Sequence, residues 1–98
     1  MIGLLDPEGT EKRVLHDLVD FRGKDVLEVG CGDGRITWLY ADTAASVFAF
    51  DPDEPSIAMA RDEMPERLNT KVEFRVADMM DIDLPDDVYD VGLLSWSI

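Results

Sequence analysis

Apolar and polar residues follow one another along the chain in a pattern that predicts strands alternating with helices. Residues 26–29 and 46–50 are short, nearly continuous apolar runs, each followed by turn residues, as is typical of strands. Residues 72–76 alternate apolar with charged side chains, which indicates a strand at the edge of a sheet, covered on one face only. Residues 88–95 form the fourth predicted strand.

Apolar residues at helical spacing occupy the segments before and between the first three strands. We expect the first helix to begin at Asp6, a favoured N-cap residue, and to stop at Gly23. We expect the third helix to end near Met64, because Pro65 cannot continue it. The residues predicted to form the buried helix faces are Val14, Leu15, Leu18, Val19, Ile36, Leu39, Tyr40, Ile57, Ala60, Met64 and Leu68.

Helices between successive strands imply right-handed crossovers and a parallel sheet. Because the third strand is expected at an edge, the spatial order becomes 3-2-1-4, and the chain reverses direction across the sheet between strands 1 and 4. We therefore predict an α/β fold, a Rossmann-like three-layer arrangement. Its ligand crevice should open beyond the carboxyl ends of the strands, at that reversal.

Length and charge narrow the classes of function. A chain of 98 residues suits one domain. Its net charge of −13 would repel a phosphate backbone or an anionic membrane, so we expect no direct nucleic-acid binding and no membrane binding. The single cysteine, the absence of a basic and apolar leader, and the absence of an apolar run of about 20 residues favour a cytoplasmic protein.

A glycine-rich turn follows the first strand. It consists of Gly30, Cys31, Gly32, Asp33 and Gly34, and it comes directly after Glu28 and Val29 at the end of that strand. Three glycines let the main chain approach a ligand, although they could also form a plain turn from strand to helix. The dinucleotide fingerprint needs a glycine at the sixth position of its motif, and Arg35 stands there when the count begins at Gly30. The turn therefore favours a ligand other than a dinucleotide.

The segment from Glu28 to Gly34 matches the pattern E/D-x-G-x-G-x-G in full, and with it the chain resembles class I S-adenosylmethionine-dependent methyltransferases over essentially its whole length. The resemblance implies S-adenosylmethionine as the cofactor and a methyl acceptor that we expect to be a small molecule. It also implies that residues 1–98 are a single cofactor-binding domain, truncated after the fourth strand. We expect a homodimer or a completing chain across the outer edge of that strand, because an uncovered edge invites pairing.

Asp51 follows the second strand and precedes Pro52. A carboxylate can accept hydrogen bonds from both hydroxyls of a ribose, and the resemblance implies that role for Asp51. Alternatively, Asp51 could cap the next helix, because helix starts favour Asp followed by Pro.

Asp78 and Met79 follow the third strand. The resemblance implies that Asp78 binds the exocyclic amine of adenine and that the backbone amide of Met79 meets a ring nitrogen. The alternative is a solvated acidic loop, since five further Asp residues follow up to Asp90. This loop lacks the glycine and the terminal Glu of a calcium loop, so we predict no metal.

Ser95 ends the fourth strand, where the transferable methyl group should point, and it is a candidate contact together with Trp96. Cys31 is expected to be a small turn residue whose backbone faces the ligand, because the one histidine, His16, is expected on a helix surface and cannot activate the thiol. We name no catalytic residue. The predicted cofactor-binding residues are Glu28, Gly30, Cys31, Gly32, Gly34, Asp51, Pro52, Asp78, Met79 and Ser95.

Two other functions stay open at this point. One is a module that binds S-adenosylmethionine without transferring its methyl group. The other is a fragment of an NAD-binding oxidoreductase.

Overall fold

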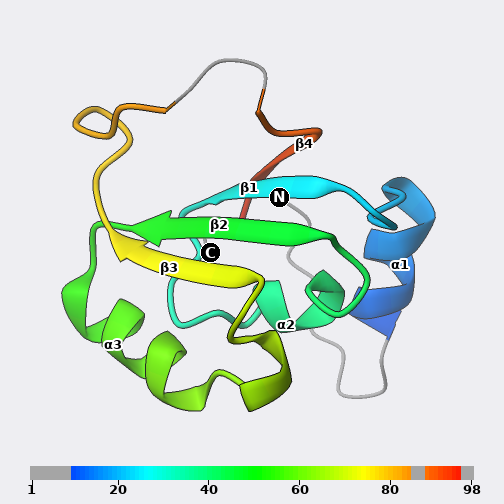
Figure 1. Cartoon of the computed structure of the whole chain (residues 1–98), viewed down its shortest axis with the longest axis horizontal. Coiled ribbons are helices and arrows are strands. Elements are labelled where there is room, and N and C mark those ends of the chain that lie inside the picture. The colour runs from blue at the N-terminus through cyan, green and yellow to red at the C-terminus, as the bar shows by residue number, and fades with distance from the viewer. Residues whose placement is uncertain (1–9, 85–87, 96–98) are drawn as a thin grey trace.

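A parallel four-stranded sheet organises the chain in the computed structural model, which describes residues 10–84 and 88–95. The strands are β1 (Asp25–Val29), β2 (Ser46–Asp51), β3 (Val72–Val76) and β4 (Val91–Leu94). They lie in the order β3-β2-β1-β4, with every neighbouring pair parallel (Figure 1). The predicted order and the predicted edge position of residues 72–76 are therefore confirmed.

Within residues 10–84 and 88–95, three α-helices and one short 3-10 helix accompany the sheet. They are α1 (Thr10–Leu18), α2 (Thr37–Tyr40), α3 (Glu54–Glu63) and η1 (Glu66–Leu68). In Figure 1, α2 and α3 lie on the same side of the sheet, and α1 contacts α2. Met64 caps the end of α3 just before Pro65, as predicted. None of the helices within the described ranges is long and apolar enough to cross a membrane.

The core lies between these helices and one face of the sheet. Because side chains alternate between the two faces of a strand, the strands send every second residue toward the helices. The buried cluster includes Val26, Val47, Ala49, Val72 and Phe74 from the strands, and Phe21, Ile36, Tyr40, Ile57, Ala60 and Leu68 from elsewhere. Because Ile36 and Tyr40 belong to this core, the segment that follows β1 lies on the helix-covered side of the sheet.

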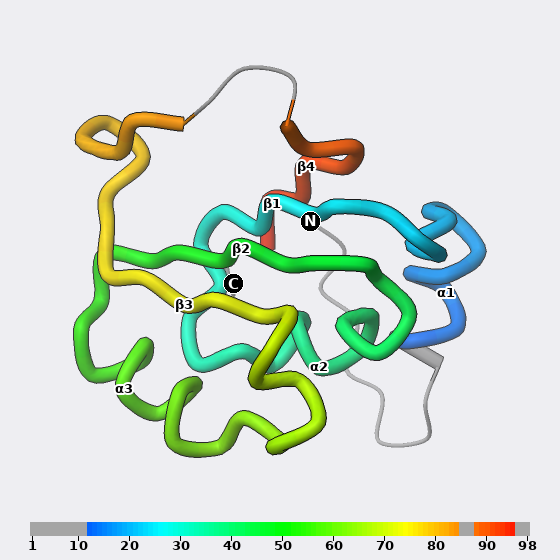
Figure 2. Tube along the Cα trace, viewed as in Figure 1, coloured from blue at the N-terminus to red at the C-terminus, as the bar shows by residue number. Residues whose placement is uncertain are grey.

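The opposite face of the sheet is less completely covered. Leu27 and Phe48, paired in register on β1 and β2, are only half-buried. Tyr89 stacks on Phe48 with ring centroids 6.4 Å apart, and the guanidinium of Arg75 lies 5.3 Å from the Phe48 ring centroid. Figure 2 shows the described residues after β3 passing on this side, away from α2 and α3, before the chain returns as β4.

The fourth strand is shorter than predicted. β4 begins at Val91, whereas Val88 and Tyr89 lie outside it, Val88 being exposed and Tyr89 stacked on Phe48. Asp90 connects them to the sheet, because its amide donates to the carbonyl of Asp25 and its carboxylate accepts from the Asp25 amide. Tyr89 therefore covers part of the sheet face, and neither residue extends β4.

The first helix also differs from the prediction. Asp6 lies outside the described residues, and Leu18, predicted on the buried face, is 66% exposed. Gly23 does not stop the helix, which ends at Leu18; it lies in the turn before β1 at φ +67°. His16 is not simply on the surface, since its Nε2 lies 2.8 Å from the Leu39 carbonyl and its ring packs edge-on against Phe21.

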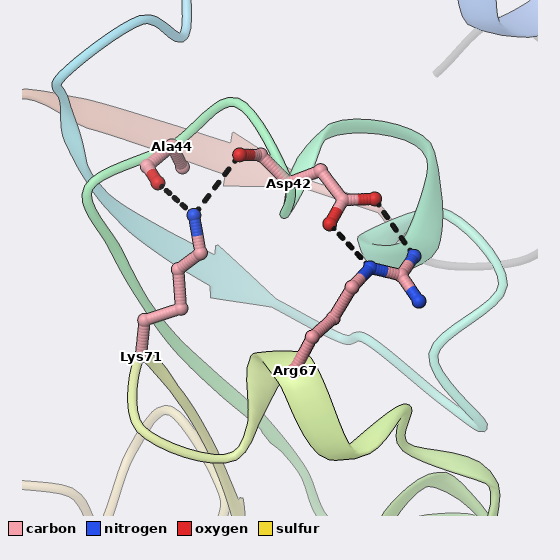
Figure 3. Close-up of polar contacts among 4 residues, drawn as sticks. All are labelled: Asp42, Ala44, Arg67 and Lys71. Atoms are coloured by element: carbon pink, nitrogen blue, oxygen red, sulfur yellow. Dashed lines mark hydrogen bonds and ion pairs between the residues drawn. The ribbon is translucent and has the colours of Figure 1, made fainter.

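Two basic side chains, one in η1 and one just before β3, bind the segment that follows α2 (Figure 3). Arg67 donates to both carboxylate oxygens of Asp42, at 2.8 and 2.9 Å, and this hydrogen bonding lowers the pKa of Asp42. Lys71 Nζ donates to the carbonyls of Asp42 and Ala44, at 3.0 and 2.7 Å. The Arg67–Asp42 pair is largely exposed, so it orients these segments more than it stabilises them.

Substituting Gly34 by alanine should destabilise the fold. The new Cβ would lie 2.9 Å from Cζ2 of Trp38, and Gly34 has φ +91°, which L side chains rarely adopt. We expect Gly34→Ala to lower the free energy of unfolding by about 2 kcal/mol in urea denaturation. The control is Gly92→Ala, whose Cβ would meet no atom within 4 Å and which should change stability by less than about 0.5 kcal/mol. Equal losses in the two variants would contradict this account.

Candidate functional site

The glycine turn after β1 is tied to the end of β2. The amides of Gly30 and Cys31 both donate to the carbonyl of Phe50, at 2.9 and 3.2 Å, and Gly34 N donates to Cys31 O at 3.0 Å. Gly30, Gly32 and Gly34 all have positive φ, at 75°, 56° and 91°. The turn therefore depends on glycine at these positions for its backbone path.

Asp51 connects β2 to the same turn. Its Oδ2 accepts from the amide of Gly32 at 2.9 Å, and its Oδ1 accepts from the amide of Asp53 at 2.8 Å. The N-cap of α3 is Asp53, which accepts from the amide of Ser56 at 3.1 Å, so the alternative of Asp51 as the cap is wrong. Each carboxylate oxygen of Asp51 can accept a second hydrogen bond, which leaves acceptors for a ligand.

A cavity of about 230 Å³ lies beside this turn. Three of the predicted site residues line it: Cys31, Gly32 and Ser95. It is also lined by Asp33, Arg35, Ile36 and Ser56, which were not predicted. A Cβ added to Gly32 would meet no atom within 4 Å, so open space lies directly against this main chain. The arrangement can accommodate a small ligand in contact with the backbone.

The segment after β3 lies next to the end of β2 but does not line this cavity. The amide of Ala77 donates to the carbonyl of Asp51 at 3.1 Å, which brings the two strand ends together. Asp78 accepts from the amide of Met80 at 2.9 Å, and Met79 is 55% exposed. Four predicted site residues therefore do not line the cavity: Asp51, Pro52, Asp78 and Met79. They lie at and after the ends of β2 and β3.

Glu28 is fully buried on the helix-facing side of β1. Its Oε1 accepts from the hydroxyls of Thr37, at 2.7 Å, and Tyr40, at 2.5 Å, both on α2. Its Oε2 accepts from the hydroxyl of Ser95, just beyond β4. Burial raises the pKa of Glu28, and the three hydroxyl hydrogen bonds oppose that rise. The carboxylate therefore joins three elements of the fold behind the cavity.

Two partners of Glu28 were missed by sequence reasoning. Tyr40 fitted the predicted apolar face of its helix, and Thr37 carried no signal of its own. A buried Glu facing the helix after it could have suggested hydroxyl partners, because a buried carboxylate requires hydrogen-bond donors.

Cys31 is 5% exposed and lines the cavity. Burial, together with the negative charges of Glu28 and Asp51, raises the pKa of its thiol. A thiol held neutral is a poor nucleophile, which favours the interpretation of Cys31 as a small turn residue.

A larger cavity, of about 830 Å³, lies elsewhere along β2 and β3. Its wall includes Ser46, Val47 and Phe48 at the beginning of β2 and residues 69–72 before and at the beginning of β3, and no predicted site residue lines it. Parallel α/β sheets bind their ligands beyond the carboxyl ends of the strands. The smaller cavity at those ends is therefore the better candidate.

Comparisons with known proteins identify relatives of this chain. A family model described as a methyltransferase domain matches residues 26–98. A probable S-adenosylmethionine-dependent methyltransferase of Mycolicibacterium smegmatis is 39% identical over 69 residues, 70% of this chain and 25% of that protein. Magnesium-protoporphyrin O-methyltransferase of Rhodobacter capsulatus is 40% identical over 62 residues, 63% of this chain and 28% of that protein.

A solved structure is similar as well. The crystal structure of an S-adenosylmethionine-dependent methyltransferase from Mesorhizobium loti has a TM-score of 0.70 and 27% identity, and the match covers 89% of this chain and 38% of that one. The chain thus matches about a quarter of the length of the two relatives and less than two fifths of the solved structure.

The buried carboxylate should give stability a specific pH dependence. Because burial raises the pKa of Glu28 above its ordinary value of 4.5, the folded chain binds this proton more tightly than the unfolded chain. The resulting stabilisation is complete below that ordinary value and is lost as pH rises through the raised pKa. Glu28→Gln cannot titrate, so its free energy of unfolding should lack this decline. Urea denaturation of the wild-type chain and of Glu28→Gln, at a series of pH values from below 4.5 upward, tests this prediction. Parallel curves of unfolding free energy against pH would contradict it.

Proposed function

The chain belongs to the family of methyltransferase domains, and we propose on that premise that it binds S-adenosylmethionine as the cofactor-binding part of a methyltransferase. The observation that carries the proposal is the hydrogen bond from Gly32 to Asp51, which joins the glycine turn of β1 to a carboxylate at the end of β2. Open space against Gly32 gives the cofactor room at this junction.

Each part of the cofactor has a proposed location at consecutive strand ends. The methionine end occupies the cavity beside Cys31, Gly32 and Ser95. The ribose lies at Asp51 and Pro52, where the carboxylate retains acceptor capacity. The adenine lies at Asp78 and Met79, adjacent to Asp51 through the Ala77 hydrogen bond. Gly30 and Gly34 give the turn its shape, and Glu28 supports it from within the core.

The walls of the cavity suit the methionine end. Asp33 and Arg35 contribute one negative and one positive charge to its lining. The methionine end of S-adenosylmethionine carries an ammonium and a carboxylate, so opposite charges on the wall complement both. This complementarity disfavours a purely anionic ligand such as a pyrophosphate.

The bound cofactor would supply an electrophilic methyl group, so the protein's task is to orient it and exclude competing water. The cavity-lining main chain and Ser95 hold the reactive end, whereas the carboxylates further along the sheet edge hold the nucleoside. No residue in the described ranges is assigned as a general base.

We propose a small-molecule acceptor. The net charge of −13 disfavours nucleic acid, and the similar protein from Rhodobacter capsulatus is named for a porphyrin substrate. We also propose that a second copy or a completing chain covers the outer edge of β4. Leu94 on that edge strand is 55% exposed, which supports this proposal.

Calorimetric titration with S-adenosylmethionine and with NAD tests the cofactor. We expect binding of S-adenosylmethionine alone, and Asp51→Ala should weaken it about tenfold, the loss typical of a charge-assisted hydrogen bond. The control is Asp62→Ala, which removes an exposed carboxylate on α3 that does not line the cavity and should leave affinity nearly unchanged. Binding of NAD in place of S-adenosylmethionine would overturn the proposal.

A second ligand separates the ribose role of Asp51 from its support of the glycine turn. The wild-type chain should bind the 2′-deoxy analogue of the cofactor more weakly than the cofactor itself, and Asp51→Ala should reduce this preference. An unchanged preference in Asp51→Ala would mean that Asp51 only supports the turn. Cofactor binding without transfer of labelled methyl to any acceptor would indicate a binding module.

A further inference from the structure

Ser95 connects the buried carboxylate to the cavity. Its hydroxyl donates to Oε2 of Glu28, and the same residue lines the cavity beside Gly32. Ser95 therefore contacts Glu28 on one side and the cavity on the other. The protonation state of Glu28 can therefore affect a ligand in the cavity through the hydroxyl group of Ser95.

The direction of that hydroxyl follows from the other partners of Glu28. A serine hydroxyl has one proton to donate and two lone pairs to accept with. Thr37 and Tyr40 donate to Oε1 of Glu28, which leaves Oε2 for Ser95. Because the hydroxyl proton of Ser95 is donated to Glu28, Ser95 can act toward the cavity only as a hydrogen-bond acceptor. The carbonyl of Gly30, 3.4 Å from Ser95 Oγ, is the more distant acceptor for the same proton.

We propose that Thr37 and Tyr40 are positioning residues that act through Glu28 to hold Ser95 as a hydrogen-bond acceptor toward the cavity. The cavity then selects a ligand group that donates, and on the proposed function this group is the ammonium of the methionine end. The inference rests on the proposed function for the identity of the ligand. That Ser95 faces the cavity as an acceptor follows from the hydrogen bonds among Ser95, Glu28, Thr37 and Tyr40 alone.

A neutral Glu28 would reverse the direction of its hydrogen bond with Ser95. Protonated on Oε2, it would donate to Ser95, occupy one of its lone pairs, and turn the serine proton toward Gly30 or the cavity. Of the described residues, Tyr40 from α2 and Cys31 from the glycine turn interact electrostatically with Glu28. Asp51 and Asp33 act on Cys31 in turn. Glu28→Gln imitates the neutral state, because its amide NH₂ donates in the place of Oε2.

The test uses two ligands that differ in one group. One is S-adenosylhomocysteine, and the other is its analogue with hydrogen in place of the α-amino group. Calorimetry on the full chain should show that Glu28→Gln loses about tenfold in affinity for S-adenosylhomocysteine and less than about twofold for the analogue. Tyr40→Phe should show the same selectivity with a smaller loss, because one of the two hydroxyls on Oε1 remains. The control is Tyr89→Phe, whose ring stacks on Phe48 outside the cavity, and it should change neither affinity.

A pH series adds a readout that a purely structural role would not move. Affinity for S-adenosylhomocysteine should fall as pH drops through the pKa of Glu28, and in Tyr40→Phe this fall should occur at higher pH, because a hydrogen bond that lowers that pKa is gone. Equal losses for both ligands, or no loss in either variant, would overturn the inference while leaving the proposed function intact. Failure of the wild-type chain to bind S-adenosylhomocysteine would instead overturn the proposed function, and the inference with it.

Discussion

A carboxylate buried among three hydroxyl groups is the interaction on which the candidate site depends. Glu28 stands on the central strand β1, and its partners come from α2 and from the end of β4. Burial of a carboxyl group is unfavourable unless hydrogen-bond partners satisfy it, so the three elements are held together at the point where the chain leaves β1. The glycine turn begins two residues later, and its path is therefore fixed from behind.

The front of the site is built from main chain. The carbonyl of Phe50 accepts from two amides of the glycine turn, and Asp51 accepts from a third at Gly32. The sheet order brings β1 to lie between β2 and β4, so one turn contacts both of its neighbours. A short chain thereby places backbone, carboxylate and hydroxyl groups around one cavity at the carboxyl ends of the strands.

Much of the architecture could be predicted from local pattern. Residues 72–76 alternate because one face is covered, and the strand formed with those bounds at the predicted edge. The fourth strand was predicted too long, because pattern alone does not separate pairing residues from Tyr89, which stacks on Phe48. Leu18 was predicted as buried from its spacing, but a helix face is buried only where a neighbour covers it.

The candidate site was predictable in part for the same reason. Glycines, and the carboxylate of Asp51 after a strand, carry a local signal. The partners of Glu28 carry none, because contact between Glu28 and Ser95, 67 residues apart, is created only when β4 pairs with β1. The cavity walls at Arg35 and Ser56 likewise follow from how α2 and α3 meet the sheet.

Mapping of backbone amide chemical shifts during titration with S-adenosylmethionine tests the central claim most directly. The account predicts that the largest changes occur at Gly32, Asp53 and Ser95, around the junction of the glycine turn with Asp51. Changes concentrated in residues 69–75, which line the larger cavity, would contradict it.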